Sequence, residues 1–184
     1  MVQTFSNMLP LGTLAPVFSL KNVSDRVTIS PKTYCKGHPF VIAFICNHCP
    51  YVIHILNGFV RVASLYQKKG VEFIAISSNN ISEFPEDSPE LMKELSTDYN
   101  FTFPYCYDST QEVAKNYQAA CTPDFYFFDQ EHKLVYRGQF DDSRPKNGVE
   151  VTGKDLTTAI DLLLTGQAPL KNQKPSLGCN IKWK

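Results

Sequence analysis

The sequence predicts an α/β domain in which a mixed β-sheet is flanked by helices. An apolar run at 38–46, a helical stretch and a β-branched run at 71–78 form a strand–helix–strand unit, whose crossover requires parallel strands. Two further strands, at 124–129 and 133–140, are joined by the short turn "QEH" and predict an antiparallel hairpin. A closing helix is predicted at 151–166.

The first unit is the most regular part of the chain. "HPFVIAFIC" (38–46) is nearly continuous in apolar residues, which is typical of a strand buried on both faces. After Cys49 and Pro50 the apolar positions recur at threes and fours, which predicts an amphipathic helix that ends near Gly70. The apolar positions of this helix are Val52, Ile55, Leu56, Phe59, Val60, Ala63 and Tyr66. "VEFIAISS" (71–78) is rich in strand-forming residues.

The segment 79–105 is predicted to be an insertion made of a loop and a short helix. That helix begins near Ser88 and Pro89, which suit a cap and a first helical turn. A further helix fits 109–119, and the helix at 151–166 ends at a glycine.

The last residues show no periodicity. We therefore predict one domain at 1–166 and a tail at 167–184. The tail is either a mobile arm or, given Ile181 and Trp183, a strap packed on the domain.

Composition excludes several classes of function. The 184 residues are 43% hydrophobic and 20% charged, which is typical of globular domains. Lysine and arginine total 18, as do aspartate and glutamate, so the formal net charge is zero. Without a basic field the chain is poorly suited to hold a phosphate backbone or an anionic bilayer. We expect neither nucleic acid nor a membrane as partner.

The start of the sequence lacks a cationic segment followed by an unbroken apolar one, so we expect no signal peptide. No stretch approaches about 18 consecutive apolar residues. A cytoplasmic location is therefore expected, where thiols are kept reduced. The six cysteines then favour metal binding or redox chemistry over a static disulfide framework.

The most informative stretch is "FICNHCPYVIHI" (44–55), in which two residues separate Cys46 from Cys49. The pair lies between a predicted strand and the amino terminus of the next helix. Backbone N–H groups and the helix dipole stabilise an anion there, so we expect a lowered pKa at Cys46. Pro50 falls in the first helical turn, where its missing N–H costs nothing. This placement favours a redox couple.

Half of a zinc site and two neighbouring buried thiols are the other interpretations of the pair. Zinc requires about four N or S ligands, and the sequence has no second pair with this spacing. His48 is confined between the cysteines, His54 lies within the helix, and Cys179 adds only one thiolate. Because a fourth ligand is hard to name, we expect no metal, and we expect no other cofactor.

A second feature stands ahead of the hairpin. In "AACTPDF", Thr122 and Pro123 precede the strand at 124–129. A proline there is misplaced unless it lies on an edge or follows a cis bond; the alternative is a trans proline in a loop. A cysteine pair at a strand-to-helix junction, followed by "TP" before a hairpin strand, resembles the thioredoxin superfamily.

The resemblance extends over nearly the whole chain and narrows to the AhpC/TSA (redoxin) branch. "LGTLAPVFSL" (11–20) resembles the start of that branch, as does the insertion at 79–105. Further motifs are "CNHCPYV", "FPYCYDSTQEVAKNY", "CTPDFYFFD", "YRGQFDDSRP" and "GCNIKWK". Together they resemble a group of cytoplasmic thioredoxin-like redoxins, and this implies a thioredoxin-like fold with an inserted helix and loop.

The resemblance also implies a thiol-disulfide oxidoreductase that acts on protein or small-molecule disulfides. An exposed Cys46 would attack the substrate disulfide, and Cys49 would resolve the mixed disulfide. Thr122 and Pro123 would present backbone to an extended substrate. His48 resembles the protein disulfide isomerase pattern and would make the couple more oxidising, between about −270 mV and roughly −120 mV.

The partners that the resemblance implies are a disulfide-containing protein or a small thiol, together with an upstream electron donor. The chain itself is expected to be a monomer or a homodimer. In thioredoxins a buried carboxylate relays protons; no motif places it here, and Glu83 in the insertion is our candidate. The alternative for Glu83 is a solvated loop carboxylate.

A peroxiredoxin-like thiol peroxidase is the alternative enzyme. Those enzymes carry Thr-x-x-Cys-Pro, and Cys49–Pro50 matches its last step, but Cys46 replaces the threonine. The replacement exchanges a peroxide-orienting hydroxyl for a resolving thiol, although any low-pKa thiolate is oxidisable. A non-catalytic redox-sensing module is the third interpretation.

Four cysteines lie outside the pair. Cys121 and Cys179 are candidates for additional redox thiols, and small apolar packing is the alternative for each. Cys35 and Cys106 are predicted to be structural. The charged residues of "YRGQFDDSRP" (136–145) are predicted to be a solvated loop face, with a substrate loop as the alternative.

Overall fold

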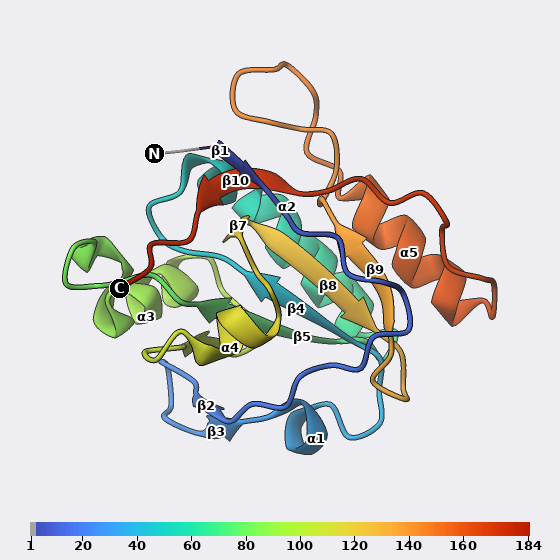
Figure 1. The fold of residues 1–184 in the computed structure, drawn as a ribbon, viewed down its shortest axis with the longest axis horizontal. Helices are drawn as coiled ribbons and strands as arrows, with labels where there is room; N and C mark the ends of the chain where they lie inside the picture. Colours follow the sequence, from blue (N-terminus) through green and yellow to red (C-terminus); the bar gives the residue numbers. More distant parts are fainter. Residues whose placement is uncertain (1–2) are drawn as a thin grey trace.

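The structure is a computed structural model that describes residues 3–184, and a five-stranded mixed sheet forms its centre (Figure 1). The strand order is β6-β5-β4-β8-β9. These strands are β4 (Phe40–Phe44), β5 (Glu72–Ser77), β6 (Tyr105–Tyr107), β8 (Asp124–Phe128) and β9 (Leu134–Gly138). β4 pairs in parallel with β5, as β5 does with β6, whereas β8 is antiparallel to both β4 and β9. The predicted mixed α/β architecture is confirmed.

The helices that the sequence predicts are all present, one of them shorter than expected, and two further short helical segments were not predicted. They are α1 (Pro31–Tyr34), α2 (Pro50–Gln67), the 3-10 turn η1 (Pro85–Asp87), α3 (Pro89–Asp98), α4 (Glu112–Asn116) and α5 (Lys154–Leu164). Ser88 caps α3, as predicted. The helix predicted at 109–119 is reduced to α4, because Gln111 adopts a left-handed backbone (φ 63°) that interrupts helical geometry before it.

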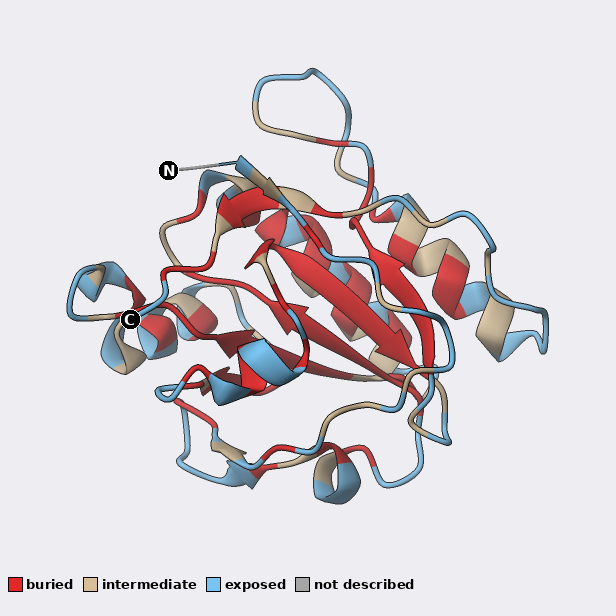
Figure 2. Ribbon diagram, viewed as in Figure 1, coloured by how far each residue is buried: buried red, intermediate tan, exposed pale blue. Residues whose placement is uncertain are grey.

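Both faces of the central sheet are covered. Successive side chains of β4 alternate between two apolar clusters, as the pleat of a strand requires: Val41 and Ala43 join one, Phe40 and Ile42 the other. The first cluster includes residues of α2, α3 and α5, and the second includes residues of α4. Figure 2 shows the strands of this sheet as buried. A strand buried on both faces explains the unbroken apolar run in the sequence.

Two smaller sheets lie outside the centre. β2 (Leu20–Lys21) and β3 (Thr28–Ile29) form a two-stranded ribbon. β1 (Gln3–Phe5), β10 (Leu177–Asn180) and β7 (Cys121–Thr122) form a three-stranded sheet with β10 in the middle. The sequence predicts no regular element within 167–184, so β10 is a finding of the structure. Its four residues are too few for a period to be recognised.

No helix among residues 3–184 is long and apolar enough to cross a membrane.

Candidate functional site

The cysteine pair lies where β4 meets α2, as the sequence predicts. β4 ends at Phe44, and Cys49 is the N-cap residue of α2, with an extended backbone (φ −70°, ψ 120°). Pro50 follows in the first turn, where helix geometry needs no N–H. The expectation that Cys46 is exposed is wrong: only 1% of Cys46 is exposed, and Cys49 is fully buried.

Both sulfur atoms contact residues that are distant in the sequence. Cys46 Sγ lies 3.4 Å from Thr122 Oγ1. Cys49 Sγ lies 3.1 Å from the carbonyl oxygen of Thr122 and 3.0 Å from Cys179 Sγ. The site therefore contains three thiols rather than two. The structure thus brings Cys179, an additional candidate from the sequence, into contact with the pair.

The pKa values of the pair differ from the sequence expectation. The pKa of Cys49 is lowered to about 5: the hydrogen bond from Cys46 has the largest effect, burial opposes it, and contacts with Cys179 and the Val52 backbone N–H act in the same direction as Cys46. The hydrogen bond to Cys49, then burial and the charge of Asp87, raise the pKa of Cys46 well above its usual range. The low pKa expected at Cys46 is therefore not found, because its hydrogen bond to Cys49, its burial and the charge of Asp87 all favour the protonated thiol.

Asp87 is a site residue that the sequence analysis missed. It comes from η1 in the insertion and is fully buried. Its Oδ1 accepts from the backbone N–H of Asn47 at 2.7 Å, and its Oδ2 accepts from the Asn79 amide at 2.7 Å. His48 Nδ1 lies 2.8 Å from Oδ2, and the imidazole ring stacks on Phe84. The insertion thus supplies the carboxylate of the site.

Glu83, the candidate carboxylate from the sequence, lies in the same insertion but is exposed. It accepts a hydrogen bond from the Asn80 amide at 3.3 Å. The solvated alternative is therefore confirmed for Glu83. Asp87, the carboxylate that is buried, is four positions further along the chain, and only the packing of η1 against the cysteine loop distinguishes the two.

Replacement of Asp87 by asparagine is expected to lower the pKa of Cys46, because the carboxylate charge is one of the causes that raise it. Asparagine keeps the size of the side chain and an acceptor for the Asn47 N–H. An NMR titration of the cysteine Cβ resonances measures the shift without requiring the sulfur to be accessible. Glu86→Gln, which removes an exposed carboxylate next in sequence, is the matched control. If Cys46 titrates identically in Asp87→Asn and in wild type, the Asp87 carboxylate does not raise the pKa of Cys46.

One group of donors could hold a metal ion. The ligand atoms of Cys46, His48 and Asp87 lie within 4.8 Å of one another. They offer one sulfur, one nitrogen and one oxygen, which suits zinc, but a structural zinc site has four protein ligands. Both oxygens of Asp87 already accept hydrogen bonds. His54 does not join the group, since its Nε2 lies 2.7 Å from Ser143 Oγ.

Thr122 and Pro123 lie against the cysteine pair, and the peptide bond between them is cis. Their expected role is to present backbone to an extended substrate. In the structure, β10 of the same chain pairs antiparallel with β7 at this place, with Cys179 opposite Thr122 and Asn180 opposite Cys121. The edge expected to bind substrate is therefore occupied by the C-terminal segment.

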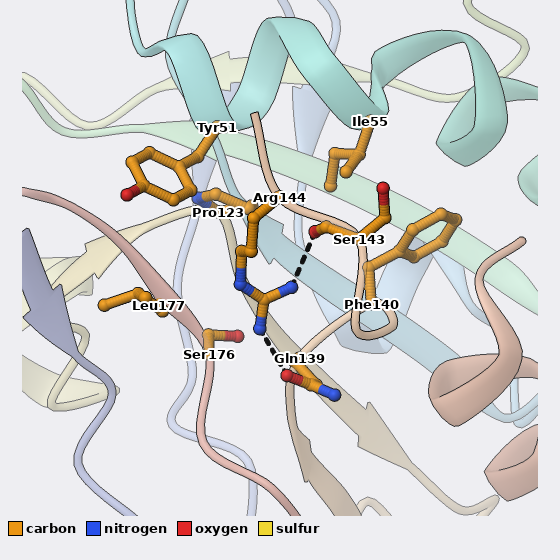
Figure 3. A pocket seen from close by; sticks show the side chains of 9 residues that line it. All are labelled: Tyr51, Ile55, Pro123, Gln139, Phe140, Ser143, Arg144, Ser176 and Leu177. Carbon is orange, nitrogen blue, oxygen red and sulfur yellow. Dashed lines mark hydrogen bonds between the residues drawn. The ribbon is translucent and has the colours of Figure 1, made fainter. Parts of the chain in front are cut away.

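A small pocket opens beside Pro123, between the first turn of α2 and the segment that follows β9. Figure 3 shows the Arg144 side chain in its centre. The guanidinium donates to the carbonyl oxygens of Asp141 and Ser143 and to the side chain of Gln139. These contacts hold Arg144 within the pocket, so the loop predicted as a solvated face is in part a pocket wall.

The remaining cysteines are buried, and Cys35 and Cys106 belong to a different apolar cluster from Cys46, Cys49 and Cys179. Burial raises the pKa of Cys35 and of Cys106 to about 12, which keeps both protonated, as their predicted structural role requires. Cys121 Sγ lies 3.7 Å from the carbonyl oxygen of Pro123. Since neighbouring side chains on a strand point to opposite faces, Cys121 points away from the thiols that Thr122 contacts.

The chain is similar to a known family and to solved structures. Residues 11–137 match the AhpC/TSA family. An uncharacterized conserved protein from Geobacillus kaustophilus is 53% identical, with a TM-score of 0.97 over 100% of this chain and 97% of the other. A hypothetical protein from Sinorhizobium meliloti 1021 is 42% identical, with a TM-score of 0.95 over 98% of each chain.

A more distant structure has a functional description. A thiol:disulfide interchange protein of the thioredoxin family from Chlorobium tepidum TLS is 17% identical, with a TM-score of 0.64 over 85% of this chain and 99% of the other. At this identity the likeness shows the fold, which is thioredoxin-like. No protein with curated annotation matches the chain.

Proposed function

Because the chain belongs to the AhpC/TSA family, we propose that it is a thiol-disulfide oxidoreductase whose Cys46 and Cys49 alternate between a dithiol and a disulfide. Family membership supports a redox function in general. The observation that carries the specific proposal is the lowered pKa of Cys49, the N-cap residue of α2, whose sulfur lies 3.0 Å from Cys179 Sγ.

The reduced site enters the reaction as a thiolate on Cys49. This sulfur attacks one sulfur of a substrate disulfide, a mixed disulfide forms, and the other substrate sulfur leaves as a thiolate that takes up a proton. Cys46 then loses its proton and attacks Cys49 Sγ. The Cys46–Cys49 disulfide forms, and the second substrate sulfur leaves with its electron pair. The substrate is reduced by two electrons and the protein is oxidised by two.

The order of attack that we propose is the reverse of the one that the sequence suggests. A thiolate is the reactive form of cysteine, and at neutral pH a pKa of about 5 leaves Cys49 ionised. Cys46, whose pKa is raised by Cys49, burial and Asp87, stays protonated until the mixed disulfide removes the charge of Cys49. Asp87 and His48, whose side-chain atoms lie within 4.8 Å of Cys46 Sγ, are the groups that we propose receive this proton.

The thiolate itself is a testable feature. The ultraviolet absorbance of thiolate in the reduced protein is expected to rise with pH around a midpoint near 5. Below that pH the proton returns to Cys49 and the absorbance falls. Cys49→Ser removes this transition, whereas Cys106→Ala retains it because the pKa of Cys106 is about 12. A wild-type protein without any transition below pH 7 contradicts the assignment of charge.

The decisive experiment equilibrates the full chain in a series of glutathione redox buffers and alkylates the thiols. Mass spectrometry then measures the state of each cysteine. We expect a reversible Cys46–Cys49 disulfide with a midpoint between about −270 and −120 mV, together with catalysed reduction of a small disulfide substrate. A Cys46–Cys49 disulfide that forms reversibly without catalysed reduction of the substrate favours the redox-sensing alternative. If the two cysteines never form a disulfide, the proposal is refuted.

One observation favours a thiol peroxidase as the second candidate. The low pKa lies on Cys49, the residue that matches the Cys-Pro step of peroxiredoxins. A peroxide would oxidise this thiolate to a sulfenic acid, and a neighbouring thiol would condense with it to give a disulfide and water. Stopped-flow mixing of the reduced protein with hydrogen peroxide distinguishes the two enzymes, because a disulfide reductase reacts faster with the disulfide substrate.

A further inference from the structure

The contact between Cys49 and Cys179 joins residues that are 130 positions apart in the chain. Their sulfur atoms are 3.0 Å apart, both side chains are buried, and 4% of Cys179 is exposed. A reacting pair of atoms is productive at about 3–3.5 Å. The two sulfurs therefore already lie at the distance from which one attacks the other.

Strand pairing places Cys179 there. Antiparallel pairing of β10 with β7 puts Cys179 opposite Thr122, whose hydroxyl and carbonyl contact Cys46 and Cys49. Gly178 makes the close approach feasible. A Cβ at this position would lie 2.0 Å from the Thr122 carbonyl oxygen and 2.6 Å from the Thr122 carbonyl carbon. Backbone atoms cannot move aside cheaply, so any larger residue at Gly178 separates the strands.

Contacts on both sides of β10 hold it in place. Ahead of the strand, Ser6 and Ser176 exchange hydrogen bonds of 3.0 and 2.9 Å. Beyond it, the Lys182 carbonyl oxygen accepts from the Asn80 backbone N–H and the Gln111 amide, both at 2.8 Å. Cys179 is thus a fixed part of the site and not a thiol on a loose arm.

We infer that Cys179 is the third member of the redox site and exchanges with the Cys46–Cys49 disulfide to form a Cys49–Cys179 disulfide. This inference rests on the proposed function, which supplies the first disulfide from a substrate. It assigns to the C-terminal segment a chemical role in the reaction and not only a structural one.

The exchange is balanced within the protein. Cys179 Sγ attacks Cys49 Sγ, and the new bond forms as the Cys46–Cys49 bond breaks. The electron pair of the broken bond leaves on Cys46, which takes up the proton that Cys179 releases. One disulfide and one thiol exist before and after the step, so no external oxidant or reductant is consumed. Cys46 is returned to the thiol state while the oxidising equivalent is held between Cys49 and Cys179.

Formation of the Cys46–Cys49 disulfide also makes Cys179 easier to deprotonate, which its attack requires. In the reduced protein, burial and the neighbouring Cys49 raise the pKa of Cys179 to about 12. Once Cys49 is part of a disulfide it carries no charge, and its share of that increase disappears. Lys182, which lowers the pKa of Cys179, remains in place.

The test oxidises the reduced full chain with a limiting amount of diamide, quenches with acid at increasing times and maps the disulfides by mass spectrometry. Wild type is expected to contain a Cys46–Cys49 and a Cys49–Cys179 disulfide, with the second increasing as the first decreases. In Cys46→Ser, diamide is expected to join Cys49 to Cys179, so that two fewer thiols react with the alkylating agent after oxidation. In the double variant Cys46→Ser/Gly178→Ala this disulfide is not expected to form, because the added Cβ separates β10 from β7 and moves Cys179 away from Cys49.

Cys121→Ala in the Cys46→Ser background is the matched control, since Cys121 lies on the same strand pair and points to the other face. This double variant is expected to keep the Cys49–Cys179 bond. Wild type that contains only the Cys46–Cys49 disulfide at every time refutes the inference and leaves the proposed function intact. Wild type that forms only Cys49–Cys179 refutes the proposed couple instead. The wild-type measurements need no variant to fold.

Discussion

Cys49→Ser is expected to lower the rate of disulfide reduction by about 10³-fold or more, because a serine hydroxyl is not ionised at neutral pH and is a poor nucleophile. Cys46→Ser/Cys179→Ser is expected to behave differently: the first attack proceeds, and a mixed disulfide with the substrate accumulates, because neither neighbouring thiol remains to resolve it. The two effects are separated by measuring steady-state turnover and, after acid quenching, the mass of the covalent adduct.

Cys35→Ala is the control for this pair of variants, since Cys35 is buried in the apolar cluster on the other face of the sheet. Its turnover should match that of wild type. If Cys46→Ser/Cys179→Ser loses the first attack and Cys49→Ser accumulates the adduct, the roles return to the order that the sequence first suggests. The experiment therefore decides which sulfur attacks, independently of whether the protein is a reductase.

Arg137→Met is expected to destabilise the protein by about 3–5 kcal/mol, because it leaves a buried carboxylate without its charged partner. Arg137 and Asp124 are both fully buried, and Arg137 Nη2 lies 3.1 Å from Asp124 Oδ2. The same nitrogen donates to the Gln118 carbonyl oxygen at 2.8 Å, and the guanidinium lies over the ring of Tyr126. Urea denaturation measures the free energy of unfolding.

Lys133→Met is the control for this prediction. Lys133 and Glu131 are closer, at 2.6 Å, but half or more of each side chain is exposed, so solvent screens the pair and the loss should be much smaller than for Arg137→Met. The double variant Asp124→Leu/Arg137→Met should recover much of the stability by replacing both charges with apolar side chains. Equal losses in Arg137→Met and Lys133→Met would show that burial does not set the strength of the Arg137 pair.

Local sequence patterns were enough to predict the strands and the helix that position the cysteine pair. The apolar run before Cys46, the helical spacing after Pro50 and the turn between the hairpin strands each depend on residues close in sequence. The parallel pairing of β4 with β5 then follows from the crossover. The resemblance to the redoxin branch added the position of Thr122 and Pro123 against the cysteines.

What could not be predicted depends on contacts between distant segments. Asp87 and Glu83 are both carboxylates of the insertion, and nothing in the nearby sequence distinguishes them. Asp87 is buried because it packs against the loop of Asn47 and His48, whereas Glu83 stays exposed. The charge preference for Cys49 results from donors that include Cys179. Arg137 falls within the strand predicted at 133–140, but its charged neighbours suggested a solvated face, and only the structure shows that it is buried against Asp124.

The C-terminal strand also gives the protein an intrinsic optical probe. Trp183 is the only tryptophan of the chain and lies three residues beyond Asn180, the last residue of β10. Trp183 is 41% exposed, and the Lys115 ammonium of α4 lies 5.9 Å from the centre of its ring. Any release of β10 from the body changes the polarity and charge around this indole. Tryptophan fluorescence therefore follows, without a label and in real time, whether the strand that carries Cys179 is docked.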